Sequence, residues 1–184
     1  MVQLSAVKGL RCVRCSHLTA LTPASYTCEH CGGNLDVEYD YAQIQSLWDR
    51  ASLACCGDRS LWRYLPLFPV KTRVDGPPVG WTPLIPARGL GECLGVPCLY
   101  VKDESRNPTG SLKDRASVLV LGRACEAQAE FVVGASSGNA AASTAALAAP
   151  VGIRCRFYVP RSIPPAKAAQ LLVFGAEVHR VDSG

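Results

Sequence analysis

The sequence predicts an α/β protein in which a small cysteine-rich module precedes a parallel sheet with flanking helices. Two observations support this fold class: two Cys-x-x-Cys pairs lie near the start, and β-like runs alternate with helix-like segments after Trp81. Strands that alternate with helices join by right-handed crossovers, which build parallel sheets. The predicted organisation is a module over residues 1–40, a linker with a helical arm over 41–80, and the α/β part over 81–184.

The two cysteine pairs of the module predict a zinc ribbon. Cys12 and Cys15 form one pair and Cys28 and Cys31 the other, with twelve residues between the pairs. Each pair places two thiolates on one tight turn, and two facing turns complete the tetrahedral sulfur site that suits zinc. A rubredoxin-like iron site and four unconnected thiols remain as alternatives. A ribbon that binds nucleic acid needs clustered Lys and Arg, whereas the basic residues of this module are followed by Asp36, Glu38 and Asp40. The ribbon is therefore interpreted as structural rather than as a nucleic-acid-binding element.

Other potential metal ligands in the chain lack this spacing. His17 and His30 lie inside the module, but four cysteines already close the site, so both histidines are predicted at the surface. The remaining cysteines are expected to be small apolar residues, mostly buried. These are Cys55, Cys56, Cys93, Cys98, Cys125 and Cys155.

Residues 41–80 predict a connecting arm. The run YAQIQSLWDRAS has a helical pattern, and RYLPLFPV and the breaker DGPPVG follow it. This order of segments predicts a short helix and then an extended stretch that lies on a larger body.

The α/β part contains four predicted strands and three predicted helices. The strand-like runs are PCLYV, EFVVGA, RCRFYV and EVHRV, and the helix-like runs are SLKDRASVLVLGRACEAQ, GNAAASTAALAA and PPAKAAQLLVFG. Ligands of open parallel sheets bind beyond the carboxyl ends of the strands. Two polar loops are expected there: KDESRNPTGSLK after PCLYV, and SSGN after EFVVGA.

The first loop leads into a helix that carries a lysine. Thr109 or Ser111 is expected to cap a helix that begins near Leu112, which places Lys113 in the first turn. The positive end of the helix dipole disfavours a charged ammonium there, and a neutral amine is what a Schiff base with an aldehyde cofactor requires. The alternative is an ordinary surface charge.

The second loop predicts an anion site. The backbone N–H groups near Gly138 and Asn139 open a helix and suit an α-carboxylate, while Ser136 and Ser137 add hydroxyl donors. The Asn139 amide is placed to hydrogen-bond a phenolate-like ring oxygen. The alternative is an ordinary helix cap that contains asparagine.

These motifs resemble the threonine synthase family of fold type II pyridoxal-phosphate enzymes. The resemblance rests on GWTPL at 80–84, NPTGSLKDRA at 107–116 and SSGNAAAS at 136–143, behind a four-cysteine ribbon and the phrase LDVEYDY. It implies that Lys113 holds the cofactor covalently and moves protons, and that Asn139 contacts the cofactor ring. It further implies that Ser136, Ser137, Gly138 and Asn139 hold the substrate carboxylate and that Thr82 lies near the active site.

The resemblance also implies an activity. Threonine synthases convert O-phospho-L-homoserine and water to L-threonine and phosphate, so a small amino acid is the expected substrate. Family members are longer than this chain, and their cofactor-phosphate loop comes after the region that ends here at Gly184. Residues 81–184 are therefore expected to form part of the catalytic domain, mostly its smaller subdomain. The full-length enzyme is expected to be a homodimer, and this chain alone is expected to be inactive. The alternatives are another enzyme of this fold type, such as a cysteate or cysteine synthase or a threonine dehydratase, and a non-catalytic zinc-ribbon binding module.

Composition restricts the partners and the compartment. Of 184 residues, 48% are hydrophobic and 18% charged, so the chain has enough apolar side chains for a core. A net charge of +4 is too small to indicate nucleic acid or an anionic membrane as partner. The uncharged stretch 131–153 is rejected as a membrane helix because it contains Ser, Gly, Asn and Pro, and the first ten residues lack the features of a secretory signal. A protein of the reducing cytoplasm is expected.

Overall fold

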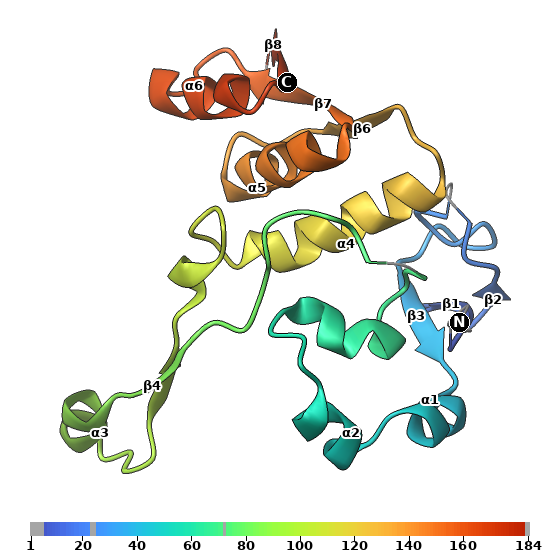
Figure 1. The fold of residues 1–184 in the computed structure, drawn as a ribbon. Coiled ribbons are helices and arrows are strands. Elements are labelled where there is room, and N and C mark those ends of the chain that lie inside the picture. Colours follow the sequence, from blue (N-terminus) through green and yellow to red (C-terminus); the bar gives the residue numbers. More distant parts are fainter. Residues whose placement is uncertain (1–5, 23–24, 72, 183–184) are drawn as a thin grey trace.

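The structure is a computed structural model that describes residues 6–22, 25–71 and 73–182 (Figure 1). Three small sheets organise it: an antiparallel sheet of order β2-β1-β3, a two-stranded sheet β4-β5, and a parallel sheet of order β6-β7-β8. This confirms the α/β class and the parallel sheet that the alternating pattern predicts. Among the described residues, no helix has the length and apolar character needed to cross a membrane.

The cysteine-rich module folds around the first sheet. Its strands are β1 (Val7–Cys12), β2 (Leu18–Thr19) and β3 (Leu35–Tyr39). The central strand β1 pairs antiparallel with both neighbours, so that Leu10 lies opposite Thr19 on one side and Val37 on the other. Among the described residues of the module, the buried apolar side chains are Ala6, Leu10, Cys12 and Cys28, which is too small a core to stabilise it without a cross-link.

The arm begins with two short, capped helices. These are α1 (Tyr41–Leu47) and α2 (Arg50–Cys55), and the 3-10 segment η1 (Leu61–Leu67) follows. Asp40 accepts a hydrogen bond from the Gln43 N–H, and Asp49 and Ser52 form a reciprocal capping box, so side chains satisfy the first free N–H groups of both helices.

The later part of the arm lies against the α/β body. Leu61, Trp62, Val70, Val74 and Val79 are buried in the same apolar core as α4, α5 and the parallel sheet. This confirms the expectation that the arm lies on a larger body.

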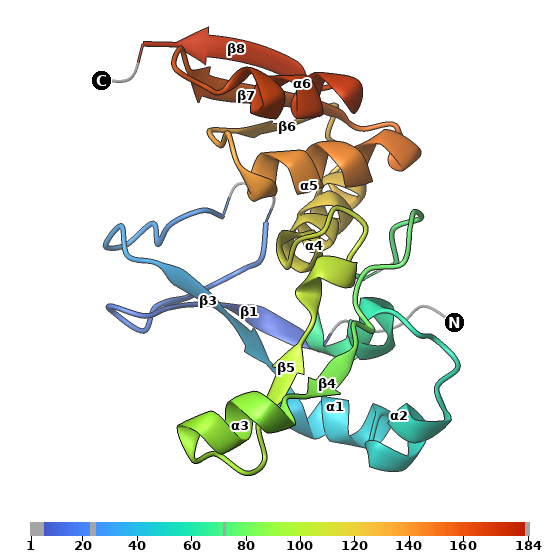
Figure 2. The same ribbon diagram turned by 90° about the vertical axis from the view of Figure 1, so that its left-hand side faces the viewer.

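The parallel sheet and its helices form the main core. The strands are β6 (Phe131–Gly134), β7 (Arg154–Pro160) and β8 (Glu177–Val181), and the helices are α4 (Lys113–Glu126), α5 (Asn139–Ala148) and α6 (Pro165–Val173), with a 3-10 turn η3 (Ala149–Val151) after α5. Figures 1 and 2 show α5 and α6 against the sheet and α4 beyond α5. Alternate residues of β7 are buried, which is the period of a strand with one covered face.

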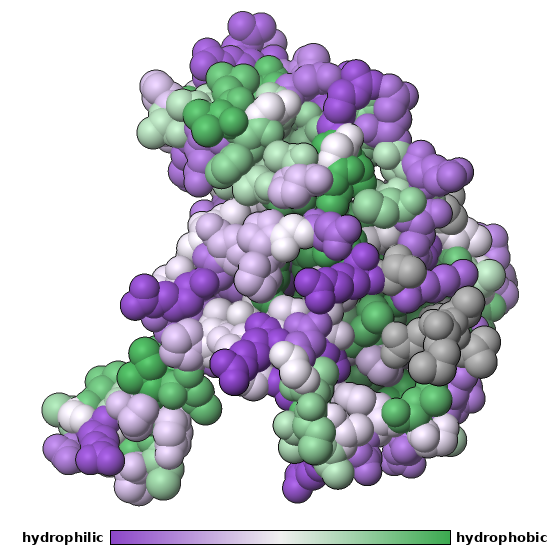
Figure 3. Space-filling view, in the orientation of Figure 1, coloured by the Kyte–Doolittle hydropathy of each residue, from purple (hydrophilic) through white to green (hydrophobic). Residues whose placement is uncertain are grey.

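One predicted strand pairs differently. The run PCLYV is expected in the parallel sheet, but β5 (Tyr100–Lys102) pairs antiparallel with β4 (Leu84–Pro86), and α3 (Arg88–Leu94) connects the two strands. That expectation is wrong because alternation of strands and helices does not specify the partner of a short strand. Both strands are exposed along their whole length, and the β4-α3-β5 segment projects from the body as a separate lobe (Figures 1 and 3).

Candidate functional site

The four cysteines of the ribbon converge on one point. Their sulfur atoms all lie within 4.8 Å of one another. The Sγ atoms of Cys12 and Cys31 are 3.4 Å apart, and those of Cys15 and Cys28 are 3.7 Å apart. A tetrahedral zinc site with Zn–S bonds of about 2.3 Å has sulfur–sulfur edges of roughly 3.8 Å, so this donor set fits zinc.

The backbone conformation and the limited space around these cysteines explain why Gly32 and Gly33 are glycines. Gly32 has a φ of +69°, the left-handed conformation that glycine adopts without strain. A Cβ on Gly33 would lie 3.0 Å from Cys12 Sγ, so a larger residue would crowd the site. Backbone hydrogen bonds, first from the Cys15 N–H and then from the Arg14 N–H, lower the pKa of the Cys12 thiol to about 6. The Cys12 thiolate, the form that binds metal, is therefore favoured at neutral pH. For Cys31, the hydrogen bond from the Gly33 N–H lowers the pKa of the thiol, but hydrogen bonds with Cys15 and Cys12 outweigh it and raise that pKa to about 12.

The histidines and the other cysteines lie outside this site. His17 and His30 are exposed and stack on each other with ring centroids 5.6 Å apart, which confirms their surface position. The expectation that most of the other cysteines are buried is wrong. Cys155 is buried and Cys56 is partly buried, whereas Cys55, Cys93, Cys98 and Cys125 are exposed. A small side chain is tolerated on either face of a helix, so residue type alone does not decide its burial.

Lys113 is the first residue of α4, and its side chain is exposed. The Ser111 hydroxyl accepts a hydrogen bond from the Lys113 N–H at 3.2 Å. Of the two candidate caps, Ser111 thus contacts the helix start, whereas the Thr109 hydroxyl donates to the Asp114 carboxylate. Gly110, with a φ of +72°, turns the chain between them.

Asp114 fixes this loop to the neighbouring helix. Its side chain is fully buried and accepts hydrogen bonds from the Thr109 N–H at 2.8 Å and from the Ser143 hydroxyl of α5 at 2.5 Å. A second contact joins the same helices, from the Thr144 hydroxyl to the Ser117 oxygen at 3.1 Å. The N-terminal halves of α4 and α5 are therefore held together, with Lys113 at the start of one helix.

The SSGN loop leads into the start of α5 next to this contact. Asn139 is the first residue of α5 and is exposed, and no side chain caps the helix. The alternative of an ordinary asparagine cap is therefore wrong. The Ser136 hydroxyl lies 3.4 Å from the Gly138 nitrogen. Helix N–H groups without a side-chain cap are suited to bind an anionic ligand.

Thr82 takes part in a hydrogen-bonded network that the sequence did not indicate. It is 5% exposed, and its hydroxyl donates to Glu104 at 2.7 Å and accepts from Arg115 at 3.2 Å. Arg115 also donates to both oxygens of Glu104, at 2.7 and 2.8 Å. The only sequence signal is that Glu104 and Arg115 flank the NPTGSLK motif. Thr82 thus connects residues 80–84 to α4.

Glu104 is expected to make stability depend on pH. Its hydrogen bonds with Arg115, and then those from Thr82 and Asn107, lower its pKa from 4.5 to about 2. A carboxyl with a lowered pKa stabilises the fold above its unfolded value, and this stabilisation is lost as the pH falls from about 4.5 towards 2. In Glu104→Gln, urea unfolding should therefore show a weaker dependence of stability on pH in this range.

The matched control is Glu92→Gln. The Glu92 carboxyl is exposed on α3 and has no hydrogen bond to the described residues. This variant should retain the full pH dependence of the unmodified protein. An identical loss in both variants would contradict the role of Glu104.

Comparison with known protein families decides the class of the protein. The family model "Pyridoxal-phosphate dependent enzyme" matches residues 76–184, more than half of the chain, and includes both helix-start loops. The chain belongs to the pyridoxal-phosphate-dependent enzyme family. The ribbon and most of the arm lie before the matched range.

Individual members of this family give a finer comparison. The chain is 39% identical to the threonine synthase of Methanocaldococcus jannaschii over 176 residues, which are 93% of this chain and 42% of that protein. It is 36% identical to the threonine synthase of Methanosarcina acetivorans over 92% of this chain and 41% of that protein. Among solved structures, the processed threonine deaminase isoform 2 of Solanum lycopersicum is 26% identical, with a TM-score of 0.50, and the match covers 56% of this chain and 28% of that one. The chain spans about two fifths of the length of the curated relatives.

Proposed function

We propose that this chain is part of a threonine synthase, a pyridoxal-phosphate-dependent lyase that converts O-phospho-L-homoserine and water to L-threonine and phosphate. The observation that carries the proposal is the extent of the similarity. The threonine synthase match covers 93% of the chain, so it includes the ribbon and the arm as well as the family domain. The threonine synthases of Methanocaldococcus jannaschii and Methanosarcina acetivorans are 39% and 36% identical to this chain, whereas the threonine deaminase is 26% identical. This difference in identity favours threonine synthase over a threonine dehydratase.

The residues at the start of α4 and α5 are proposed to hold pyridoxal phosphate. Bound to the enzyme, this cofactor supplies an electron sink for a substrate carbanion. Lys113 is the first residue of α4, which the Asp114–Ser143 hydrogen bond joins to α5, and its amine is proposed as the covalent attachment point. The same amine would also move protons at the α and β carbons of the substrate.

The SSGN loop is proposed to orient the ligands. The N–H groups at Gly138 and Asn139, with the hydroxyls of Ser136 and Ser137, would bind the α-carboxylate of a small amino-acid substrate. The Asn139 amide would hydrogen-bond the ring oxygen of the cofactor. Because the Thr82 hydroxyl already contacts Glu104 and Arg115, its proposed contribution near the substrate is to position the loop at 80–84.

The ribbon is proposed to bind zinc in a structural role. Cys12, Cys15, Cys28 and Cys31 use all four tetrahedral positions, which leaves none for a substrate or a water. A closed site of this kind stabilises the module and has no catalytic role.

An assay of the protein expressed from its complete gene tests the proposed reaction. With pyridoxal phosphate and O-phospho-L-homoserine, equal amounts of phosphate and L-threonine are expected. Formation of 2-oxobutanoate from L-threonine without phosphate release would instead indicate a threonine dehydratase. Sulfur-containing products from O-acetylserine or O-phosphoserine would indicate a cysteine or cysteate synthase.

A further inference from the structure

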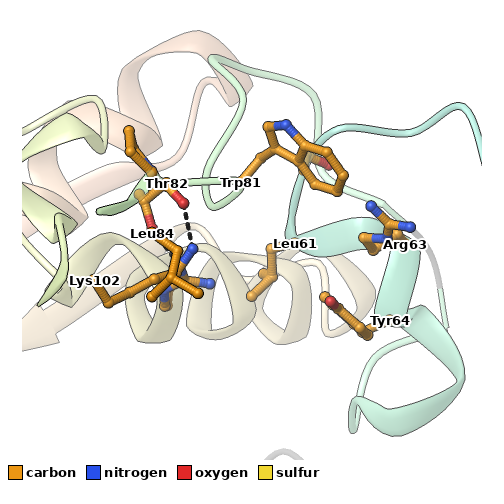
Figure 4. Close-up of a pocket in the computed structure, with 10 residues that line it drawn as sticks. Leu61, Arg63, Tyr64, Trp81, Thr82, Leu84 and Lys102 are labelled. Atoms are coloured by element: carbon orange, nitrogen blue, oxygen red, sulfur yellow. Dashed lines mark hydrogen bonds between the residues drawn. The ribbon is translucent and has the colours of Figure 1, made fainter. Parts of the chain in front are cut away.

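A cavity lies beside the loop at 80–84, next to the hydrogen-bonded network of Thr82. It has a volume of about 560 Å³ and is lined by residues of 60–64 and 81–84 together with Lys102 and Arg115. Figure 4 shows Trp81 and Arg63 on one side, Lys102 and Thr82 on the other, and Leu61 between them. Neither Lys113 nor the SSGN loop lines this cavity. We propose that it binds a small molecule that carries an anionic group on a planar ring, a function that the proposed reaction does not require.

The charges of the lining favour an anion. Its charged residues are all cationic: Arg63, Lys102 and Arg115. Glu104 neutralises Arg115 through two hydrogen bonds, so the charges of Arg63 and Lys102 remain for a ligand. The Lys102 ammonium also donates to the Thr82 carbonyl oxygen, which holds it at the edge of the cavity. Two cations that no carboxylate neutralises attract carboxylates and phosphates and repel cationic ligands.

Arg63 is held in place but incompletely paired. Its Nη2 atom donates to the Leu53 carbonyl oxygen, and its Nε atom is buried without a hydrogen-bond partner among the described residues. The Arg63 side chain is partly buried, and a buried N–H of a cationic group without a hydrogen bond is destabilising. A nearby anion compensates for it electrostatically. This is the unpaired charge that the ligand's anionic group would approach.

The aromatic residues beside Arg63 favour a ring. Trp81 is 54% exposed, and the Arg63 guanidinium carbon lies 4.5 Å from the centroid of its ring. Tyr64 lies on the same side and is 37% exposed. An exposed indole next to a cation offers a face on which a second planar ring stacks.

The backbone presents Trp81 in an unfavourable conformation. Its φ of +53° lies in the left-handed region, which a large side chain rarely adopts. Hydrogen bonds anchor the residues on both sides, because the Gly80 N–H donates to the Asn107 side chain and the Thr82 hydroxyl donates to Glu104. Strain that the surrounding structure maintains is typical of ligand-binding positions.

Phenyl phosphate, inorganic phosphate and phenol are the probes that test the proposal. Isothermal titration calorimetry should show that phenyl phosphate binds at least about tenfold more tightly than either inorganic phosphate or phenol. In an NMR spectrum of the indole N–H groups, the signal of Trp81 should shift, and the signals of Trp48 and Trp62 should not. Equal binding of inorganic phosphate and phenyl phosphate would overturn the recognition of a ring.

Variants locate the binding site. Arg63→Gln and Lys102→Gln should each weaken binding of phenyl phosphate by about tenfold or more. The matched control Arg88→Gln removes an exposed arginine of α3 and should leave binding unchanged. Unaltered binding in both cavity variants, with circular dichroism melting curves that match the unmodified protein, would refute the proposal. Lys102 is exposed, so its replacement tests the site even if Arg63→Gln fails to fold.

A further variant separates this cavity from the proposed active site. Lys113→Ala should bind phenyl phosphate as the unmodified protein does. Loss of binding in Lys113→Ala together with normal binding in Arg63→Gln would place the probe at the cofactor site and overturn the inference. Absence of threonine synthase activity would leave the calorimetric result unaffected.

Discussion

Replacement of Lys113 by alanine is expected to lower the rate of phosphate release from O-phospho-L-homoserine by roughly 10³-fold or more, because one side chain both attaches the cofactor and moves protons. Cofactor attachment has a second readout. After incubation with pyridoxal phosphate and reduction with borohydride, peptide mapping should find the label on the peptide that contains NPTGSLKDR. The Lys113→Ala protein should carry no label.

The chain provides matched controls for this experiment. Lys102 and Lys167 are also exposed lysines, but Lys102 lies on β5 and Lys167 on α6. Lys167→Ala should retain both the label and the activity. Labelling of Lys102 or Lys167 in the unmodified protein would contradict the assignment of Lys113.

Replacement of Cys28 by serine is expected to remove the zinc and to unfold the ribbon. The unmodified protein should contain about one zinc per chain, as measured by metal analysis. Structural zinc contributes roughly 10–16 kcal/mol to the folding of comparable small modules, and the buried side chains of this module do not replace that contribution. In Cys28→Ser, protease cleavage should therefore increase within residues 6–40.

Cys125→Ser is the control for the zinc experiment. Cys125 is an exposed cysteine of α4 and lies outside the four-sulfur cluster. Its replacement should change neither the zinc content nor the cleavage of the ribbon. Undiminished zinc in Cys28→Ser would refute the metal site.

The sequence alone indicated the features that depend on local spacing. Four thiols in two Cys-x-x-Cys pairs predicted the cluster that the structure forms, because each tight turn fixes its own two sulfurs. The start of α4 at Lys113 and that of α5 at Asn139 followed from the polar loops before them. The parallel sheet followed from the alternation of strands and helices.

Tertiary structure decided the features that depend on partners distant in the sequence. β5 pairs with β4 and lies outside the parallel sheet, because pairing depends on how the chain is folded back and not on the strand itself. Asp114 is buried where α4 packs on α5, and the hydroxyl of Ser143, 29 residues later, donates a hydrogen bond to its carboxylate. The cavity beside Trp81 arises where the arm meets β4, β5 and α4. Local sequence determines which turns and helices form, but burial and charge pairing depend on which surfaces meet, and only the packed chain determines that.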